Sequence, residues 1–283
     1  MGRPTDKVGD AFPRAPSQEE WDRMSLEERA RVAEALPNEV TYEEMAPPEG
    51  DLHQEAKYSA LEMLRGYFGN QARKVYVGSE LPVYYPAERR FAPDLLVVFD
   101  VESHKRGKWL VSQEGKGLDW VMEVHVGGDR KKDAVFNVRR YARLGIPEYF
   151  IYDRARERLE GYRLESPEAR EYTRMEPRHG RFVSRVLGLE LELVDDKLRF
   201  WAGNALLLES AEIVARMKER ADEEARLRQA AEQRAEEEAR LREAAEQRAD
   251  AEARLREESD RLREAAERRA AELQAQLARL RQP

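Results

Sequence analysis

Residues 120–126 read WVMEVHV, an apolar stretch with one glutamate at its centre. Such a run of Trp, Val and Met favours a β-strand that is covered on both faces. Because strand side chains alternate, Glu123 and His125 point to one face of the sheet, while Met122 and Val124 point to the other. The stretch therefore predicts a buried strand that carries a carboxylate into the core of an α/β fold.

Other segments extend this strand into a sheet. Buried strands are predicted over residues 94–101, which contain LLVVF, and over 148–153, which pairs with 159–164. Helices are predicted over residues 51–68 and 130–144, the second closed by Gly145. These elements predict an α/β fold with a central mixed sheet flanked by helices. Shorter strands are expected at residues 74–77, 80–85, 181–193 and 197–201, with Pro82 indicating an edge.

Composition divides the chain into three predicted parts. Residues 1–50 form an N-terminal extension, with a short helix that starts at the capping box of Ser25 and ends before Pro37, and then a linker. Residues 51–203 hold the α/β domain. Residues 204–283 form a long charged helix, because residues 219–282 contain no Gly, Pro, aromatic or β-branched residue.

The tail repeats every two heptads, since ARLR recurs at residues 225, 239 and 253. Leucines at 227, 241, 255 and 262 share one heptad position, but arginine occupies that position at 234 and 248. Two interpretations stay open. The tail is either a coiled coil that forms a homodimer or binds a partner protein, or a single solvated helix held by Glu–Arg pairs.

Two acids lie where a carboxylate is costly to bury, Asp94 at the start of an apolar strand and Glu123 in the middle of another. If the strands are neighbours, both converge with His125. Two carboxylates plus water suit Mg²⁺, with Mn²⁺ as a substitute, and such an ion generates hydroxide and stabilises a phosphoryl transition state. The alternatives are that Asp94 caps a turn, that Glu123 pairs with Lys or Arg, and that His125 is a structural strand residue.

Residues 127–133 read GGDRKKD and lead into the second helix. Backbone amides at the helix start, together with Lys131 and Lys132, predict a phosphate-binding edge. Arg139 and Arg140 add positive charge along the helix. Asp133, Asn137 and Tyr141 share one helical face, at spacings of four residues. The alternative is an ordinary solvated helix face.

An ordered set of motifs resembles the Uma-two family of bacterial restriction-type endonucleases, in the PD-(D/E)xK nuclease superfamily. The set consists of FAPD at residues 91–94, VMEV at 121–124 and RYARLGIPEYFIYD at 140–153. The resemblance covers roughly residues 40 to 200, and His53 matches a histidine often found in the first helix of the family. It implies a restriction-endonuclease-like core and a metal-dependent phosphodiesterase site, in which Asp94 and Glu123 are the metal ligands.

The resemblance also implies a lysine that is absent from its usual places. The superfamily carries it two residues after the glutamate, where this chain has His125. Members of this branch often place it in the following helix, four residues before the tyrosine, where this chain has Asn137. Lys132, or less favourably Lys131, is expected to orient water or stabilise charge on the phosphate, and His125 to act as a donor or weak base.

The remaining composition excludes several other classes of protein. The 283 residues include no cysteine and carry a formal net charge of −7. Absent cysteine fits a reducing cytoplasm, no apolar run is long enough to span a membrane, and the N-terminus lacks a signal-peptide core, so a cytoplasmic protein is expected. The four histidines have no zinc spacing, and no P-loop, dinucleotide fingerprint or nucleophile elbow occurs.

The leading hypothesis is a Mg²⁺-dependent endonuclease that hydrolyses DNA, with Asp94, Glu123, His125 and Lys132 as catalytic residues. Lys131, Arg139, Arg140 and Arg143 would contact the DNA backbone. The rival hypothesis is a weak or inactive nuclease fold that serves as an interaction protein and assembles through its tail.

Overall fold

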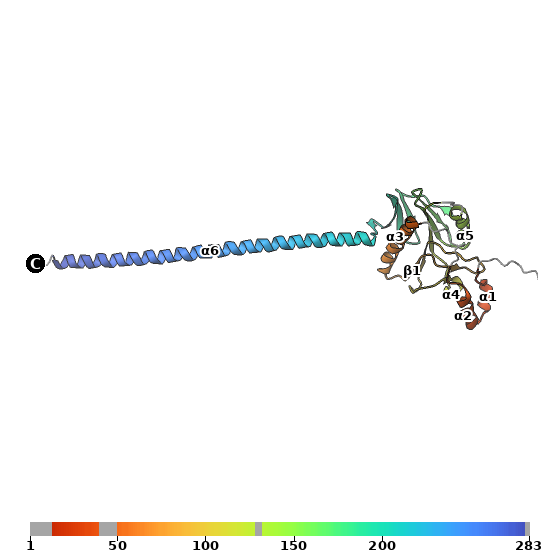
Figure 1. Ribbon diagram of the computed structural model, residues 1–283, viewed down its shortest axis with the longest axis horizontal. Helices are drawn as coiled ribbons and strands as arrows, with labels where there is room; N and C mark the ends of the chain where they lie inside the picture. Colours follow the sequence, from red (N-terminus) through yellow and green to blue (C-terminus); the bar gives the residue numbers. More distant parts are fainter. Residues whose placement is uncertain (1–12, 40–49, 128–131, 281–283) are drawn as a thin grey trace, which may run out of the picture. The chain divides into compact units, whose positions relative to one another are not determined.

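A computed structural model describes residues 13–39, 50–127 and 132–280 of the chain. Contacts within the chain group it into two compact units, Met1–Ile213 and Val214–Pro283. The first unit is an α/β fold whose main elements are labelled in Figure 1. None of the helices in the described ranges has a stretch long and apolar enough to cross a membrane.

The central sheet of the first unit has six strands in the order β1-β3-β5-β6-β7-β8. β5 and β6 are parallel, and every other neighbouring pair is antiparallel. The predicted mixed sheet is therefore confirmed. Its strands are β1 Val75–Gly78, β3 Leu95–Phe99, β5 Trp120–His125, β6 Glu148–Asp153, β7 Arg158–Arg163 and β8 Thr173–Arg174.

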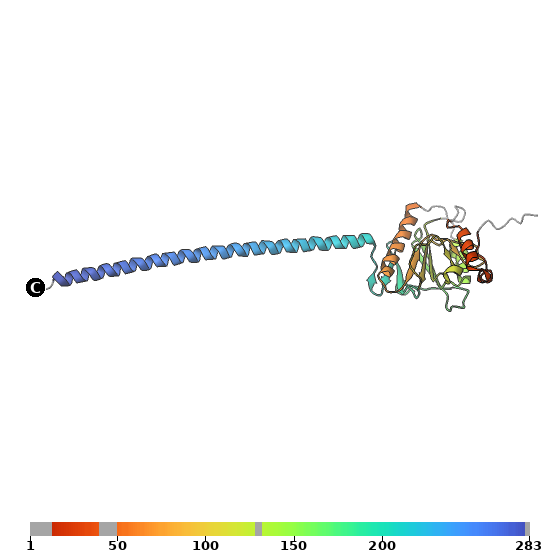
Figure 2. The same ribbon diagram turned by 90° about the horizontal axis from the view of Figure 1, so that it is seen from below.

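Helix α3, Gly50–Gly69, covers one face of this sheet, and Figure 2 shows it in orange alongside the strands. Its apolar stripe, with Ala60 and Leu64 completely buried, packs in one cluster with Val97 and Met122. This is the predicted amphipathic helix. A four-stranded antiparallel sheet, β12-β11-β10-β9, adds its buried side chains to the same cluster. Its strands are β9 Arg181–Ser184, β10 Leu189–Val194, β11 Lys197–Ala202 and β12 Ala205–Leu206.

The opposite face of the central sheet packs against the helix that follows β5. The segment predicted as a helix over residues 130–144 consists of a π-helical turn η1, Lys132–Asn137, and then α5, Val138–Arg143. Residues 130 and 131 lie outside the described residues. Tyr141 of α5 is buried in one cluster with Val121 and Ile151 of the sheet. The two faces of the sheet are therefore covered by helices from different parts of the chain.

The described part of the N-terminal segment, residues 13–39, packs through a small third cluster. Helices α1, Gln18–Arg23, and α2, Leu26–Ala35, both begin with a capping box, the second of which was predicted. Trp21 and Leu36 are buried with Tyr84 and Leu110. The last two belong to a pair of short parallel strands, β2 Val83–Tyr84 and β4 Trp109–Leu110, with α4, Val111–Glu114, directly after them.

The predicted strand 80–85 is shorter than expected, since β2 contains two residues. Glu80 has a φ of 51°, in the left-handed region, which interrupts an extended backbone. Pro82 has no amide to donate to a strand neighbour. The strand therefore starts after Pro82 and pairs with β4, outside the central sheet.

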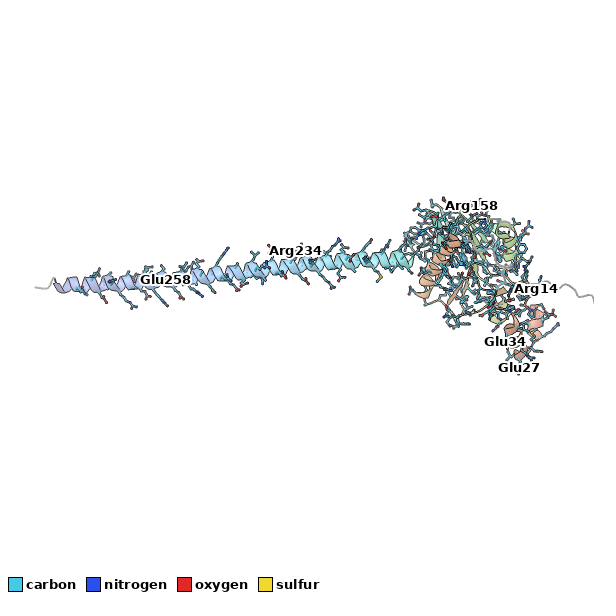
Figure 3. All side chains as sticks on the ribbon, in the orientation of Figure 1. Arg14, Glu27, Glu34, Arg158, Arg234 and Glu258 are labelled. Carbon is cyan, nitrogen blue, oxygen red and sulfur yellow. The ribbon has the colours of Figure 1, made fainter. Side chains whose placement is uncertain are left out.

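The long C-terminal helix is confirmed as α6, Ser210–Leu280, with 71 residues. At 1.5 Å per residue it is about 105 Å long. Its first turn belongs to the first unit, where the Ser210 hydroxyl donates to Glu62 and Arg199 pairs with Glu212. Over residues 214–276 of the second unit the side chains are solvent-exposed apart from the half-buried Ala230, as Arg234 and Glu258 illustrate in Figure 3.

Candidate active site

Asp94 and Glu123 meet where β3 begins. The antiparallel register pairs Leu95 with Met122, so the next step along the chain places Asp94 opposite Glu123. The amide of Asp94 donates to Oε2 of Glu123 at 3.3 Å, and the amide of Val124 donates to Oδ2 of Asp94 at 2.8 Å. The two acids that the sequence singled out are therefore held next to each other by reciprocal hydrogen bonds.

Two side chains from the helix after β5 hold Glu123 in place. The hydroxyl of Tyr141 donates to Oε1 of Glu123 at 2.7 Å, and Nδ2 of Asn137 lies 3.4 Å from the same oxygen. Asn137 and Tyr141 are four residues apart, on the one helical face predicted from their spacing. Glu123 and Asn137 are both buried. These donors offset the cost of keeping the carboxylate away from water.

His53 of α3 reaches the acid pair from the other side of the sheet. Its Nε2 lies 3.3 Å from Oδ2 of Asp94, and both side chains are 16% exposed. Arg154, just after β6, fixes this end of α3 because its guanidinium donates to the carbonyl of Leu52 at 2.9 Å and pairs with Glu55 at 2.8 Å. The hydrogen bond to Arg154 also lowers the pKa of the Glu55 carboxyl.

A buried lysine on the same helix pairs with a glutamate whose side chain is 54% exposed. Lys57, one helical turn after His53, is 5% exposed and pairs with Glu80. The amide of Glu80 donates to the carbonyl of Pro93 at 3.0 Å, directly before Asp94 in the chain. Lys57 is thus a cation in the neighbourhood of the acid pair. The prediction of site residues had missed it, although its position four residues after His53 on the apolar side of an amphipathic helix was a signal.

The other predicted site residues differ in burial, and some of them lie outside the described residues. His125 is buried on β5, on the same face as Glu123. Lys132 begins η1, but its side chain, like the whole of Lys131, lies outside the described residues. Arg139 is solvent-exposed.

Arg140 is in a different environment from the one its predicted role needs. It is 7% exposed, donates to the carbonyl of Arg89, and lies 3.4 Å from Glu88. Its guanidinium also stacks over Phe91, 4.6 Å from the ring centroid. Burial lowers its pKa from the usual value. The guanidinium is engaged by these contacts inside the protein, which does not suit the predicted contact with a DNA backbone.

The donor set at the acid pair fits a hard divalent cation. Mg²⁺ is usually held by one or two carboxylates and keeps several water molecules. Asp94 and Glu123 supply two carboxylates close together, with Glu123 the more deeply buried. Among the residues that the structure describes, no group of three or more His, Cys, Asp or Glu side chains is arranged to hold a metal ion. Two carboxylates leave the remaining coordination positions of such an ion to water.

Comparison with solved structures finds similarity to a protein from Anabaena variabilis described as a "putative nuclease belonging to DUF820". The two are 16% identical, with a TM-score of 0.37, over 46% of this chain and 71% of that one. No curated protein matches the chain. The family model Uma2, described as "Putative restriction endonuclease", matches residues 19–196, which include every described residue of the site. Since the match spans more than half of the chain, this protein belongs to the Uma2 family, and the resemblance seen in its sequence is confirmed.

Proposed function

We propose that this protein is a Mg²⁺-dependent endonuclease that hydrolyses DNA phosphodiester bonds, with Mn²⁺ as an effective substitute. The observation that carries the proposal is the meeting of Asp94 and Glu123 across two strands. These two carboxylates would hold the ion. When bound there, the ion would lower the pKa of a water molecule and stabilise negative charge on the phosphate.

The surrounding residues have separate tasks in this proposal. His53 positions Asp94, while Tyr141 and Asn137 position Glu123. His125 and Lys132 are the groups proposed to orient the attacking water or to donate to the phosphate. Arg139, which is exposed, and Lys131 would contact the DNA backbone. Hydrolysis adds water across one P–O bond and leaves a phosphate monoester and a hydroxyl group.

Plasmid nicking tests the proposal directly. Purified full-length protein should convert supercoiled plasmid to the open circle with Mg²⁺ or Mn²⁺, and not in EDTA. Asp94→Asn and Glu123→Gln keep the size of each side chain and remove its charge, so both variants should lose nicking. Asp195→Asn is the matched control, because it removes a carboxylate from an exposed turn between β10 and β11. Nicking that survives in the double variant would overturn the proposal.

One observation favours the rival, an interaction protein with little or no nuclease activity. An asparagine amide approaches Glu123 at the position where the family resemblance implies a lysine. A calorimetric titration with Mn²⁺ distinguishes the nuclease from the interaction protein. Binding in the micromolar to millimolar range that disappears in Glu123→Gln supports the nuclease. No binding, together with a stable dimer in sedimentation, supports the rival.

The tail is proposed to self-associate as a coiled coil, or to dock a partner protein. Support comes from leucines 227, 241, 255, 262 and 273, which are 55–67% exposed. Glu–Arg pairs four residues apart, such as Glu224–Arg228 and Glu238–Arg242, support the alternative of a single solvated helix. Sedimentation of the full chain should show a dimer that Leu241→Lys with Leu255→Lys converts to a monomer. If the wild type is a monomer at all concentrations, the tail is a single solvated helix and not a self-associating coiled coil.

A further inference from the structure

We propose that the substrate is DNA with unpaired bases, and that Phe136 is the platform on which a base beside the cleaved phosphate stacks. This inference rests on the proposed nuclease function and names its substrate class. It concerns the π-helical turn η1, whose last residues are Val135, Phe136 and Asn137. Single π-helical turns often occur at functional sites.

The turn exposes two large apolar side chains directly before the residue that contacts Glu123. Phe136 is 58% exposed and Val135 is 49% exposed, whereas the next residue, Asn137, is buried against Glu123. An exposed phenylalanine ring is therefore one residue away from a direct contact of the site. A ring exposed to this extent is accessible to another aromatic ring.

A buried cation lies near this ring. The guanidinium of Arg140 lies 5.9 Å from the centroid of Phe136 and 4.6 Å from that of Phe91. Arg140 is itself fixed by Glu88 and by the carbonyl of Arg89. A guanidinium is attracted to the π-system of an aromatic ring, so this contact favours one orientation of Phe136. The residue predicted to bind phosphate is thus better suited to supporting the ring.

The opposite flank of the acid pair has a similar feature. Leu52 is 56% exposed and precedes His53, which contacts Asp94. Both elements that hold the two acids therefore expose an apolar side chain directly beside the contacting residue. Arg139, three residues after Phe136, is exposed and adds a positive charge for a phosphate. Apolar contacts combined with a cation match the chemistry of a nucleic-acid strand.

Unpaired bases fit this surface better than a duplex does. In a duplex each base is stacked on both faces, so an aromatic side chain has no free π-face to contact. Bases of a single strand, a mismatch or a loop have exposed faces, and aromatic side chains bind them with little sequence preference.

Binding measured in EDTA tests the inference apart from cleavage. Fluorescein-labelled single-stranded and duplex oligonucleotides of one sequence are titrated with the full-length protein, and anisotropy is recorded. The wild type should bind the single strand more tightly. Phe136→Ala should weaken that binding by about 5- to 150-fold, the equivalent of about 1–3 kcal/mol per stacked base, and change duplex binding little.

Two further variants identify stacking as the cause. Phe136→Tyr keeps an aromatic ring and should retain wild-type binding, whereas Phe136→Ile keeps an apolar side chain without a ring and should behave like Phe136→Ala. Tyr58→Ala is the matched control, because Tyr58 is 57% exposed and lines a pocket with Leu207, Leu208 and Ile213. Thermal melting confirms that each variant is folded.

The outcomes distinguish this inference from the proposed function. Equal affinity for both DNA forms, an unaffected Phe136→Ala variant, or full binding by Phe136→Ile would overturn the stacking platform. Each of these results leaves metal-dependent nicking by Asp94 and Glu123 standing. Nicking that persists when Asp94 and Glu123 are replaced overturns the nuclease proposal, even if Phe136 is found to bind single strands.

Discussion

Asp94 and Glu123 hold each other across the start of β3, where the amide of Asp94 donates to Oε2 of Glu123 at 3.3 Å. A second hydrogen bond runs in the opposite direction, from the amide of Val124 on the strand of Glu123 to Oδ2 of Asp94, at 2.8 Å. Each carboxylate is therefore positioned by the backbone of the other strand. This arrangement keeps two like charges close together, which is a situation that a divalent cation relieves.

Tyr141→Phe should weaken metal binding without unfolding the protein. The variant removes the hydroxyl that donates to Oε1 of Glu123 at 2.7 Å, while its ring stays in the core. Loss of one such orienting hydrogen bond typically costs about 10- to 100-fold in metal affinity. Electron paramagnetic resonance of free Mn²⁺ measures it. Tyr172→Phe is the control, since its hydroxyl donates to the carbonyl of Ile146 at the same 2.7 Å. Equal Mn²⁺ affinity in both variants would contradict the prediction.

Asn137→Lys should increase the nicking rate. The amide of Asn137 lies 3.4 Å from Glu123, so a lysine at this position places its ammonium group beside the acid pair. A positioned group that donates to the phosphate or orients water contributes about 100-fold or more to the rate of such reactions. Asn137→Met has a side chain of similar length without the charge and serves as the control. If lysine and methionine variants nick at the same rate, the asparagine does not limit the site.

Much of the site was predictable because strand alternation is strict. Glu123 stands alone among apolar neighbours, so its side chain had to enter the core on one side of β5. Its partners were visible only as a helical face of Asn137 and Tyr141, which an ordinary solvated helix shows as well. The register of β3 against β5 places Asp94 opposite Glu123, and this register depends on contacts between residues far apart in the chain.

His53 and Arg140 show why the rest was not predictable. His53 lies 41 positions before Asp94 in the chain, and no local pattern indicates which end of α3 reaches the start of β3. Arg139 and Arg140 are adjacent and carry the same charge, so the sequence alone does not distinguish their roles. On α5 one points into the core and the other into solvent, which depends on where the π-helical turn ends. Short elements such as β4 and α4 were missed because two to four residues carry too little periodicity.

Gly161→Ala should destabilise the first unit. An added Cβ would lie 2.9 Å from Cε1 of Phe150 and 3.0 Å from the sulfur of Met175, both inside a packed core. Overpacking of this kind costs about 1–3 kcal/mol. Gly66→Ala is the opposite case, because it lies within α3 and its Cβ would meet nothing within 4 Å. That variant should gain about 0.5–1 kcal/mol. Urea unfolding measures both, and a stabilised Gly161→Ala would show that the core around β7 is looser than described.

The two capping boxes should make the N-terminal helices sensitive to acid. Hydrogen bonds from the backbone and side chain of Ser25 lower the pKa of Glu28 below its usual 4.5, and those from Ser17 do the same for Glu20. A carboxyl whose pKa is lower in the folded state stabilises that state above the unfolded pKa. Its contribution is lost as the pH falls through the lowered value.

Replacing both glutamates removes this dependence. Glu20→Gln with Glu28→Gln keeps a side chain that can still accept from and donate to the cap, but it has no proton to gain. The melting temperature of the double variant, followed by circular dichroism, should fall less steeply than that of the wild type between about pH 5 and about pH 3. Glu19→Gln with Glu27→Gln removes the same charges from the same two helical turns and should keep the wild-type slope. If both double variants show the same slope, the acid sensitivity of the protein comes from other carboxylates.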